Sequence, residues 1–317
     1  ERGFKLKKYI FKRLTYMILT LFIIITLTFF LMRSIPGDPL ASMAQMLPEQ
    51  TRANFHAKYG LDKPLYQQYL LYMKNLLRLD LGESVVFPGR SIAGTISKTS
   101  PVSAMVGGTA LLIGVSIGVT LGIVAALNKN KWPDYVVMFI AILGVTIPVF
   151  VLASLVQLVF AVKLGWFPAS GWGKAKNMVL PVLVLCFGPI ASYARYIKSS
   201  MLDTLEQDYV LTARAKGLSE TKVITRHVLR NSLLPSVTML AGSIVGIFTG
   251  AFVTEKMFSI PGIGFYYISS INNHDYNMTL GTTVFYAILF VVMQLIVDFV
   301  YVLIDPRIRL SNDSMEG

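Results

Sequence analysis

Few residues of this chain are grouped in a way that could catalyse a reaction. The three histidines, His56, His227 and His274, are scattered and do not have the spacing of metal ligands. The chain has no G-x-x-x-x-G-K-[ST] loop, so it lacks the usual cradle for the phosphates of ATP. No Ser, His and Asp can be grouped as a nucleophilic triad. We therefore expect no catalytic site, no metal and no cofactor bound by this chain.

A charged segment between two long apolar runs could bind a partner and not catalyse a reaction. It extends from Asp208 to Pro235 and begins Asp-Tyr-Val-Leu-Thr-Ala-Arg-Ala-Lys-Gly-Leu-Ser. Its composition predicts a helix over Asp203–Lys216, a break at Gly217, and a second helix over Glu220–Leu233. The proline that ends the segment would open the next apolar run. A helical, water-soluble insert of this kind must lie on one face of a membrane.

The first half of this charged segment has a composition suited to binding a partner protein. Ala213 and Ala215 are small and would let a partner approach closely, while Arg214 and Lys216 would supply salt links. Ser219 is the expected N-cap of the second helix. The alternative is an amphipathic pair of helices that lies on the lipid headgroups. Spacing alone does not decide between these two interpretations.

The composition indicates an all-α membrane protein. Apolar residues make up 54% of the chain and charged residues only 15%, whereas soluble domains average about 25% charged residues. The mean hydropathy is +0.60. The formal net charge is +12, but the basic residues flank apolar runs and do not gather on one domain, which argues against a nucleic-acid partner. The single cysteine, Cys186, allows no intrachain disulfide.

Six windows of about 20 residues are nearly free of charged residues. A helix of this length crosses the hydrocarbon core of a membrane. The predicted transmembrane helices are 14–32, 99–128, 135–162, 177–197, 235–254 and 276–304. The connecting parts are a tail (1–13), a long helical segment (33–98), two loops (163–176 and 255–275), the loop with the charged segment (198–234) and a second tail (305–317).

The distribution of lysine and arginine predicts the orientation of these spans. Basic residues are concentrated in 1–13, 128–134, 198–234 and 305–317, which fall on one side when there are six spans. By the positive-inside rule that side is cytoplasmic, so both termini are expected there. The loop 163–176 also has three lysines, but the total over the short loops still favours this orientation.

The segment 33–98 is predicted to contain two helices on the opposite, extracytoplasmic side. These are Pro48–Tyr59 and Pro64–Arg78, with Gly60 and Gly82 as stops. In the second helix, apolar residues recur at helical spacing and form one stripe. The members of this stripe are Leu65, Tyr69, Tyr72, Met73, Leu76 and Leu77. We expect a small cap packed on the membrane face; the alternative is that the cap also touches an extracellular partner.

Small residues within the spans predict close helix packing. Glycines occur four residues apart in the second and fifth predicted spans, which places them on one helix face. They are Gly114, Gly118 and Gly122, and then Gly242, Gly246 and Gly250. The alternative for the fifth span is that its glycines line a substrate path.

Two other residues stand out within the apolar runs. Pro148 is expected to kink the third span because it removes a backbone hydrogen bond. Asp298 is an acid within the last apolar run, so a proton or ion role has to be considered. It lies close to the predicted cytoplasmic end, so we expect a structural role.

The charged segment resembles the EAA loop of ABC importer permeases, in the form found in the oligopeptide/dipeptide/nickel permease family. Four further stretches agree with this family, in order along nearly the whole chain. They are Ile35-Pro-Gly-Asp-Pro39, Tyr59-Gly-Leu-Asp-Lys-Pro-Leu65, Phe258-Ser-Ile-Pro-Gly-Ile-Gly264 and Leu303-Ile-Asp-Pro-Arg-Ile-Arg309. The chain departs from the general EAA pattern: Leu211 stands where an acid is expected, Arg230 stands where a proline is common, and Leu234-Pro235 comes late.

This resemblance implies a type I importer permease subunit, with 99–304 as the permease core. It implies docking of an ATPase on the first part of the charged segment, and signature motifs on the extracytoplasmic side. The implied docking residues are Asp208, Tyr209, Thr212, Ala213, Arg214, Ala215, Lys216, Gly217, Leu218 and Ser219. The implied extracytoplasmic signature residues are Pro36, Gly37, Asp38, Pro39, Pro261, Gly262 and Gly264. Substrate-binding residues stay unknown.

The implied partners are a second homologous permease, two cytoplasmic ATPase subunits, an extracytoplasmic binding protein and membrane lipid. ATP and Mg would be used by the ATPase subunits and not by this chain. Peptide is the leading substrate, with nickel or a metal chelate next and glutathione third. The competing function classes are a secondary transporter, which usually has more spans and inverted repeats, and a membrane-embedded enzyme.

Overall fold

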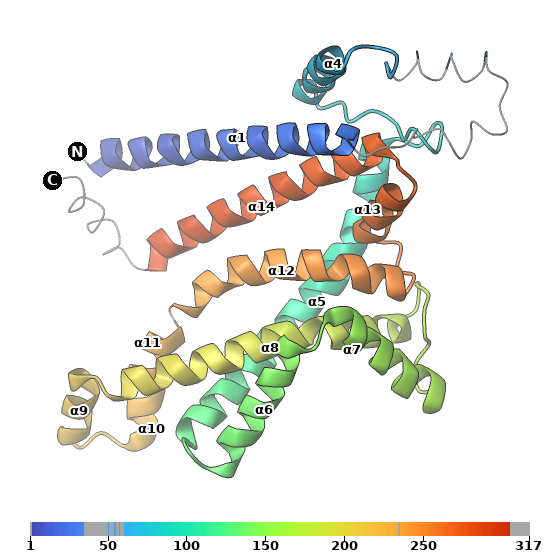
Figure 1. Ribbon diagram of the computed structural model, residues 1–317. Helices are drawn as coiled ribbons and strands as arrows, with labels where there is room; N and C mark the ends of the chain where they lie inside the picture. The colour runs from blue at the N-terminus through green and yellow to red at the C-terminus, as the bar shows by residue number, and fades with distance from the viewer. Residues whose placement is uncertain are drawn as a thin grey trace. The chain divides into compact units, whose positions relative to one another are not determined.

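The computed structural model describes residues 2–34, 50, 54, 57, 60–233 and 235–304, and this described part is almost entirely helical (Figure 1). The all-α fold expected from composition is confirmed. The chain divides into two compact units. The first comprises Glu1–Val102 and Pro261–Val292, and the second Ser103–Ile260 and Met293–Gly317.

Most helices belong to one unit, but two pass from one unit into the other. The first unit contains α1 (Arg2–Ser34), α4 (Leu65–Leu77) and α13 (Ile263–Asn272). The second unit contains α6 (Trp132–Thr146), α7 (Val149–Val156), η1 (Gln157–Lys163), α8 (Ala175–Leu205), α9 (Asp208–Ala215), α10 (Glu220–Val223), η2 (Ile224–Val228), α11 (Leu229–Leu233) and α12 (Ser236–Met257). Helices α5 (Ile92–Leu127) and α14 (Tyr276–Ile304) begin in the first unit and continue in the second.

Several of these helices are long and apolar enough to cross a membrane. Within the described residues there are four, and a bent pair makes five if it is counted as one span. The four are Lys12–Ser34, Ile92–Leu127, Ala175–Leu205 and Tyr276–Ile296. Helix α12, with 22 residues, covers most of the fifth predicted span. The chain is therefore a multi-pass membrane protein, and the count of six spans stays a prediction.

The third predicted span is two helices and not one. The pair α6 and α7–η1 is bent by 108°, at the position where Pro148 predicted a kink. Ile147 is extended, with φ −76° and ψ 120°, because a residue before proline is disfavoured in the helical region. The kink expected at Pro148 is confirmed, and the span predicted over 135–162 is divided there into two helices.

The π-helix η1 follows this break and holds a side chain that ties two parts of the second unit together. The amide Nε2 of Gln157 donates to the carbonyl of Ala169 at 2.8 Å and to that of Met257 at 3.2 Å. The loop after η1 is thereby joined to the end of α12. No local signal in the sequence predicts this bond, because its acceptors are backbone atoms distant along the chain.

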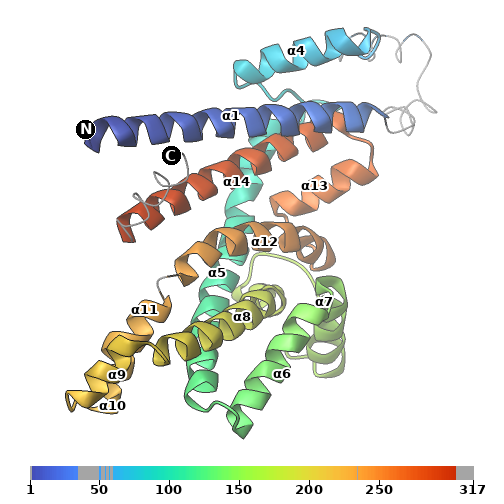
Figure 2. The same ribbon diagram turned by 60° about the vertical axis from the view of Figure 1, so that its left-hand side comes forward.

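The glycines of α5 pack against α8, as their spacing predicts. An added Cβ at Gly118 would lie 2.8 Å from the Ile190 carbonyl oxygen and 2.8 Å from the Tyr193 Cβ. The same close approach occurs at Gly114 and Gly122, and α5 passes behind α8 in both views (Figure 1, Figure 2). The backbones of α5 and α8 are therefore in near contact, and no larger residue fits between them.

The glycines of α12 do not repeat this arrangement at the position that is described. An added Cβ at Gly242 would meet nothing within 4 Å, so this residue makes no close contact with another described helix. Gly246 and Gly250 lie outside the residues whose surroundings are described.

Helix α4 is the second of the two helices predicted in the segment 33–98. It begins after Pro64 and ends at Leu77, and the chain turns at Leu79, which has φ 61°. The expected stop at Gly82 is therefore wrong by one short turn. Tyr69 and Tyr72 of the predicted stripe pack against Phe29 of α1. The predicted helix 48–59 lies almost entirely outside the described residues.

Candidate functional site

The charged segment folds as two short helical parts joined by a glycine turn. Helix α9 ends at Ala215, Gly217 has φ +76°, and the second part runs through α10, η2 and α11 to Leu233. The break at Gly217 and the second helix are as the sequence predicts. The start of the first helix is not, because Asp203–Leu205 belong to α8 and the extended residue Gln207 separates α8 from α9.

The two parts share a small apolar core with the ends of α5 and α8. Its buried members are Ala126, Ile197, Met201, Val210, Ala213, Val223 and Val228. Ala213 is only 5% exposed, so its methyl group faces this core. It does not form the small surface patch with Ala215 that the sequence suggested. The core fixes the charged segment to the long helix α8.

The exposed face of the charged segment combines apolar and basic side chains. Tyr209, Leu211 and Leu218 are 42%, 53% and 38% exposed, although large apolar side chains usually turn inward in a helix of this kind. Other exposed residues on this stretch are Asp208, Thr212, Arg214, Ala215, Lys216, Gly217 and Ser219. Exposed aromatic and basic side chains together are typical of a protein-binding surface.

Polar contacts hold this face in shape. The Arg214 guanidinium bonds both carboxylate oxygens of Glu220, at 2.6 Å and 3.2 Å, across the glycine turn. This hydrogen-bonded pairing lowers the pKa of Glu220. The Asn231 Nδ2 donates to the Tyr209 hydroxyl at 3.0 Å, which links α9 to α11. Ser219 occupies the N-cap position as expected, but its side chain makes no capping hydrogen bond.

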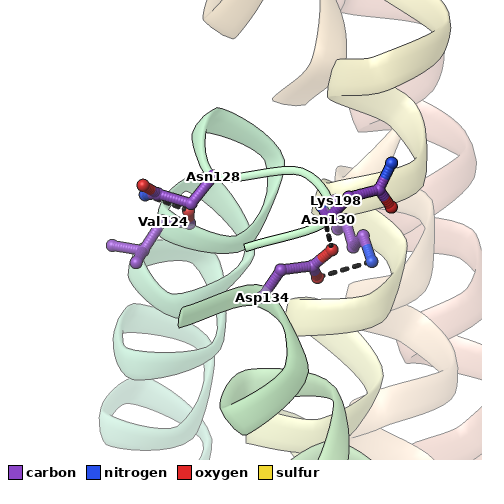
Figure 3. A network of polar contacts seen from close by, with 5 residues as sticks. All are labelled: Val124, Asn128, Asn130, Asp134 and Lys198. Carbon is purple, nitrogen blue, oxygen red and sulfur yellow. Dashed lines mark hydrogen bonds and ion pairs between the residues drawn. The ribbon is translucent and has the colours of Figure 1, made fainter. Parts of the chain in front are cut away.

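A buried ion pair anchors α6 to α8 beside the charged segment (Figure 3). The Lys198 Nζ lies 2.5 Å from the Asp134 Oδ1, and Asp134 is only 3% exposed. The backbone N–H of Asn130 donates to the other oxygen of this carboxylate at 3.1 Å. The tight turn between α5 and α6 is therefore fastened to α8. This pair was not expected from the sequence, although an acid at the start of an apolar helix was its signal.

A second buried acid organises the first unit. Asp275 is 1% exposed, and its Oδ2 accepts a hydrogen bond from the Ser84 hydroxyl. Its Oδ1 accepts from the N–H of Val85 at 3.1 Å and from the N–H of Met278 at 3.2 Å. The acid therefore caps the start of α14 and holds a loop from near the start of α5. We call this arrangement the Asp275 anchor.

The signature residues after α12 form a buried turn. Gly262 is the N-cap of α13, with φ −87° and ψ 173°, and both Ile263 and Gly264 are buried. This role is structural: Pro261 and Gly262 turn the chain into the short helix α13, where a loop was expected over 255–275. The other expected signature residues, Pro36, Gly37, Asp38 and Pro39, lie outside the described residues. So do Asp305 to Arg309 and the side chain of Asp298.

A cavity of about 480 Å³ lies within the second unit. It is bordered by the break between α6 and α7, by α8 and by α12. Its lining includes Gly144, Ile147, Leu185, Gly188, Pro189, Ser192, Gly242 and Ser243. Two features of the sequence indicated a cavity here. They are the kink expected at Pro148 and the alternative that the glycines of the fifth predicted span line a substrate path.

Two family models match this chain and together cover most of it. The description "Binding-protein-dependent transport system inner membrane component" matches residues 118–310. The description "Binding-prot-dependent transport system membrane comp, N-term" matches residues 6–90.

Curated proteins are similar to this chain over nearly its full length. The dipeptide transport system permease protein DppB of Bacillus subtilis is 45% identical over 305 residues, covering 96% of this chain and 99% of the relative. The oligopeptide transport system permease protein OppB of Haemophilus influenzae is 43% identical, covering 95% and 99%. The OppB protein of Escherichia coli is 41% identical over the same shares.

A solved structure shares the fold at low sequence identity. It is described as an amino acid ABC transporter with histidines, and it aligns with a TM-score of 0.55 at 12% identity. The alignment covers 66% of this chain and 94% of the other.

Proposed function

This chain belongs to the family of binding-protein-dependent transport system inner membrane components, and from that membership we propose that it is the permease subunit of an ATP-driven importer of dipeptides or oligopeptides. The observation that carries the substrate is the 45% identity to a dipeptide permease along 96% of the chain. The subunit itself is not catalytic, since hydrolysis of ATP with Mg takes place in separate ATPase subunits.

The exposed face of the charged segment is the surface on which an ATPase subunit docks in this proposal. Tyr209, Leu211 and Leu218 would enter a groove of the partner, and Lys216 would pair with an acid at its rim. Arg214 is already paired with Glu220, so its main role is to stiffen the turn. The glycine turn at Gly217 keeps the two helical parts at a fixed angle.

Helix α8 supplies the mechanical link between this surface and the cavity. The same helix contributes Ile197 and Met201 to the core of the charged segment and Leu185 and Gly188 to the cavity lining. The last residue of α8 that lines the cavity, Ser192, is five positions before Ile197, which corresponds to about 7.5 Å of helix. When ATP binding closes the ATPase subunits, the displacement would be transmitted along α8 to the walls of the cavity.

The full assembly in this proposal has four further subunits. They are a second homologous permease, two ATPase subunits on the cytoplasmic side, and a binding protein on the other side that delivers the peptide. Both termini of this chain are cytoplasmic in this arrangement, as the distribution of basic residues supports. Substrate crosses between the two permeases, within the lipid bilayer.

Purification from the native membrane in mild detergent tests the assembly. We expect a second multi-pass permease and ATPases with a Walker motif to co-purify. Reconstituted in liposomes with the binding protein, the complex should take up a labelled dipeptide or tripeptide only with ATP. Uptake of a nickel chelate or of glutathione in its place would change the substrate. Solute movement by this chain alone, without ATP, would contradict the proposal and indicate a secondary transporter.

A further inference from the structure

The cavity of the second unit has a lining without charged side chains. Among the described residues that border it there is no Asp, Glu, Lys, Arg or His. The lining consists of glycines, aliphatic residues, Met239, Phe187, Pro189 and two serines, Ser192 and Ser243. A pocket usually fixes its ligand through a few polar groups set in an apolar wall. Apart from the two hydroxyls, such groups in this wall have to come from the backbone.

The first such backbone group is at the break between α6 and α7. Pro148 has no N–H, so it cannot donate to the carbonyl of Gly144 as the fourth residue along a helix normally does. The N–H of Ile147 is already used, because it donates to the carbonyl of Leu143 at 3.0 Å. Gly144 and Ile147 both border the cavity. The last carbonyls of α6 are therefore acceptors that the helix itself does not pair.

The second backbone group is on α8. Pro189 lies inside this helix and has no N–H for the carbonyl of Leu185. A helical carbonyl points along the axis toward the residues three and four positions later, which here are Gly188 and Pro189. All three of these residues border the cavity, and an added Cβ at Gly188 would meet nothing within 4 Å. Gly188 therefore adds no side chain that could cover this carbonyl.

We propose that this cavity is half of a transport site that binds the main chain of a peptide. The carbonyls of Gly144 and Leu185 accept hydrogen bonds from the peptide N–H groups or its terminal ammonium. The glycines 188 and 242 leave room for the peptide backbone against the wall. This inference rests on the proposed function, because the ligand class is taken from it.

The chemistry of this lining suits a transporter that accepts many peptides. All peptides share N–H and C=O groups, whereas their side chains differ in charge and size. A wall of backbone acceptors and small residues recognises the shared groups and does not select among side chains. Broken helices also form the substrate sites of other transporters, because their ends offer unpaired backbone groups inside the membrane.

A proline substitution tests the role of the Leu185 carbonyl directly. Pro189→Ala restores an N–H at position 189 and would pair this carbonyl within the helix. The matched control is Pro181→Ala, since Pro181 is the other internal proline of α8. Pro181 leaves the carbonyl of Asn177 unpaired in the same way, but neither of these two residues borders the cavity. In the assembled complex in liposomes, we expect Pro189→Ala to lower tripeptide uptake about tenfold, as the loss of one hydrogen bond to a charged group would. Pro181→Ala should stay within about twofold.

A second pair of variants keeps the test decisive if the proline variant fails to assemble. Gly188→Leu and Gly242→Leu place a side chain in the cavity, where space is open. The control is Gly108→Leu on α5, which also has nothing within 4 Å of its added Cβ but does not border the cavity. We expect the first two variants to lose most uptake and the control to keep it. Equal peptide uptake by the three leucine variants would overturn the proposal. A lipid found in the cavity that does not affect transport would also overturn it.

The readouts separate failure of this inference from failure of the proposed function. ATPase activity stimulated by peptide-loaded binding protein should be unchanged in the two controls, Pro181→Ala and Gly108→Leu, because neither position borders the cavity or lies on the docking face. If the unmodified complex takes up no peptide, the proposed function fails. If the unmodified complex takes up peptide and Pro189→Ala matches Pro181→Ala, only the main-chain site fails.

Discussion

Gly217 turns the chain between α9 and α10 with a left-handed backbone. Its φ of +76° disfavours any residue with a side chain, although an added Cβ would touch nothing. The penalty for a typical residue is about 1–2 kcal/mol, which is enough to shift the angle between the two helical parts. A change at this residue therefore acts on the shape of the docking face and not on a direct contact.

We predict that Gly217→Trp inserts and assembles but loses substrate-stimulated ATPase activity. The bulky residue strains the turn and covers the docking face. The matched control is Gly217→Asn, because asparagine tolerates the left-handed region better than other residues with side chains. It should keep most of the activity. Unchanged ATPase activity and uptake in Gly217→Trp would contradict a docking role for this turn.

Asp275 is a buried acid that joins two distant parts of the first unit. Asp275→Ala removes three acceptor contacts and leaves buried donors of Ser84, Val85 and Met278 without that partner. We expect a loss of about 2–4 kcal/mol in the free energy of unfolding of this unit. Thermal unfolding in detergent and protease cleavage within 83–91 would measure it.

The control for the Asp275 anchor is another aspartate that bonds a backbone N–H in the same region. Asp80 accepts from the N–H of Gly82 at 2.8 Å and is exposed. Asp80→Ala should cost about 1 kcal/mol or less, since water replaces the lost contact. Equal effects of the two substitutions would mean that Asp275 is not an anchor.

At the scale of elements, α5 and α8 form a closely packed pair in the second unit. Three glycines on α5 approach the backbone of α8, each with an added Cβ at 2.8 Å from the nearest atom. Neither helix can slide or separate without losing this packing. The pair can therefore carry a displacement from the charged segment to the cavity as one body.

We predict that Gly118→Leu prevents folding of the second unit. The side chain would need the space of the Ile190 carbonyl and the Tyr193 Cβ, and overpacking against backbone cannot relax by a change of rotamer. The yield of monodisperse protein after gel filtration should fall to background. Gly108→Leu on the same helix is the control and should give normal yield.

The elements that could be predicted from sequence are those with a local cause. Pro148 removes one hydrogen bond and Gly217 permits one turn, and both effects appear where they were expected. The glycines of α5 share one face for a geometric reason alone. By contrast, Ala213 was expected on the surface but is buried. The residues that bury it come from α5, α8 and the later part of the charged segment, so no local pattern predicts its burial.

The parts of the site that were missed depend on partners distant in the sequence. Asp134 pairs with Lys198, and Asp275 bonds Ser84, so neither acid has a neighbour that would identify its role. The cavity is formed by residues of four elements and has no motif. Two prolines predict that the carbonyls of Gly144 and Leu185 are unpaired, but only the structure shows that both residues border the same cavity.

At the scale of the whole molecule, the orientation in the membrane is open to direct measurement. The chain has a single cysteine, Cys186, which is buried, so a Cys186→Ala background allows labelling at chosen sites. We predict that a membrane-impermeant maleimide labels Trp166→Cys from outside the cell and Lys131→Cys only in inverted vesicles. Both positions are exposed. Labelling of both from the same side would contradict the predicted topology.

The Asp275 anchor also has a consequence for the time course of synthesis. Ser84 and Asp275 are 191 positions apart, and a ribosome that adds 5–20 residues per second needs about 10 to 40 s for that distance. During this interval the loop around Ser84 has already been made but has no carboxylate to bind. The first unit is complete only after its second part, Pro261–Val292, has emerged. The region made first thus gains its last contacts only near the end of synthesis.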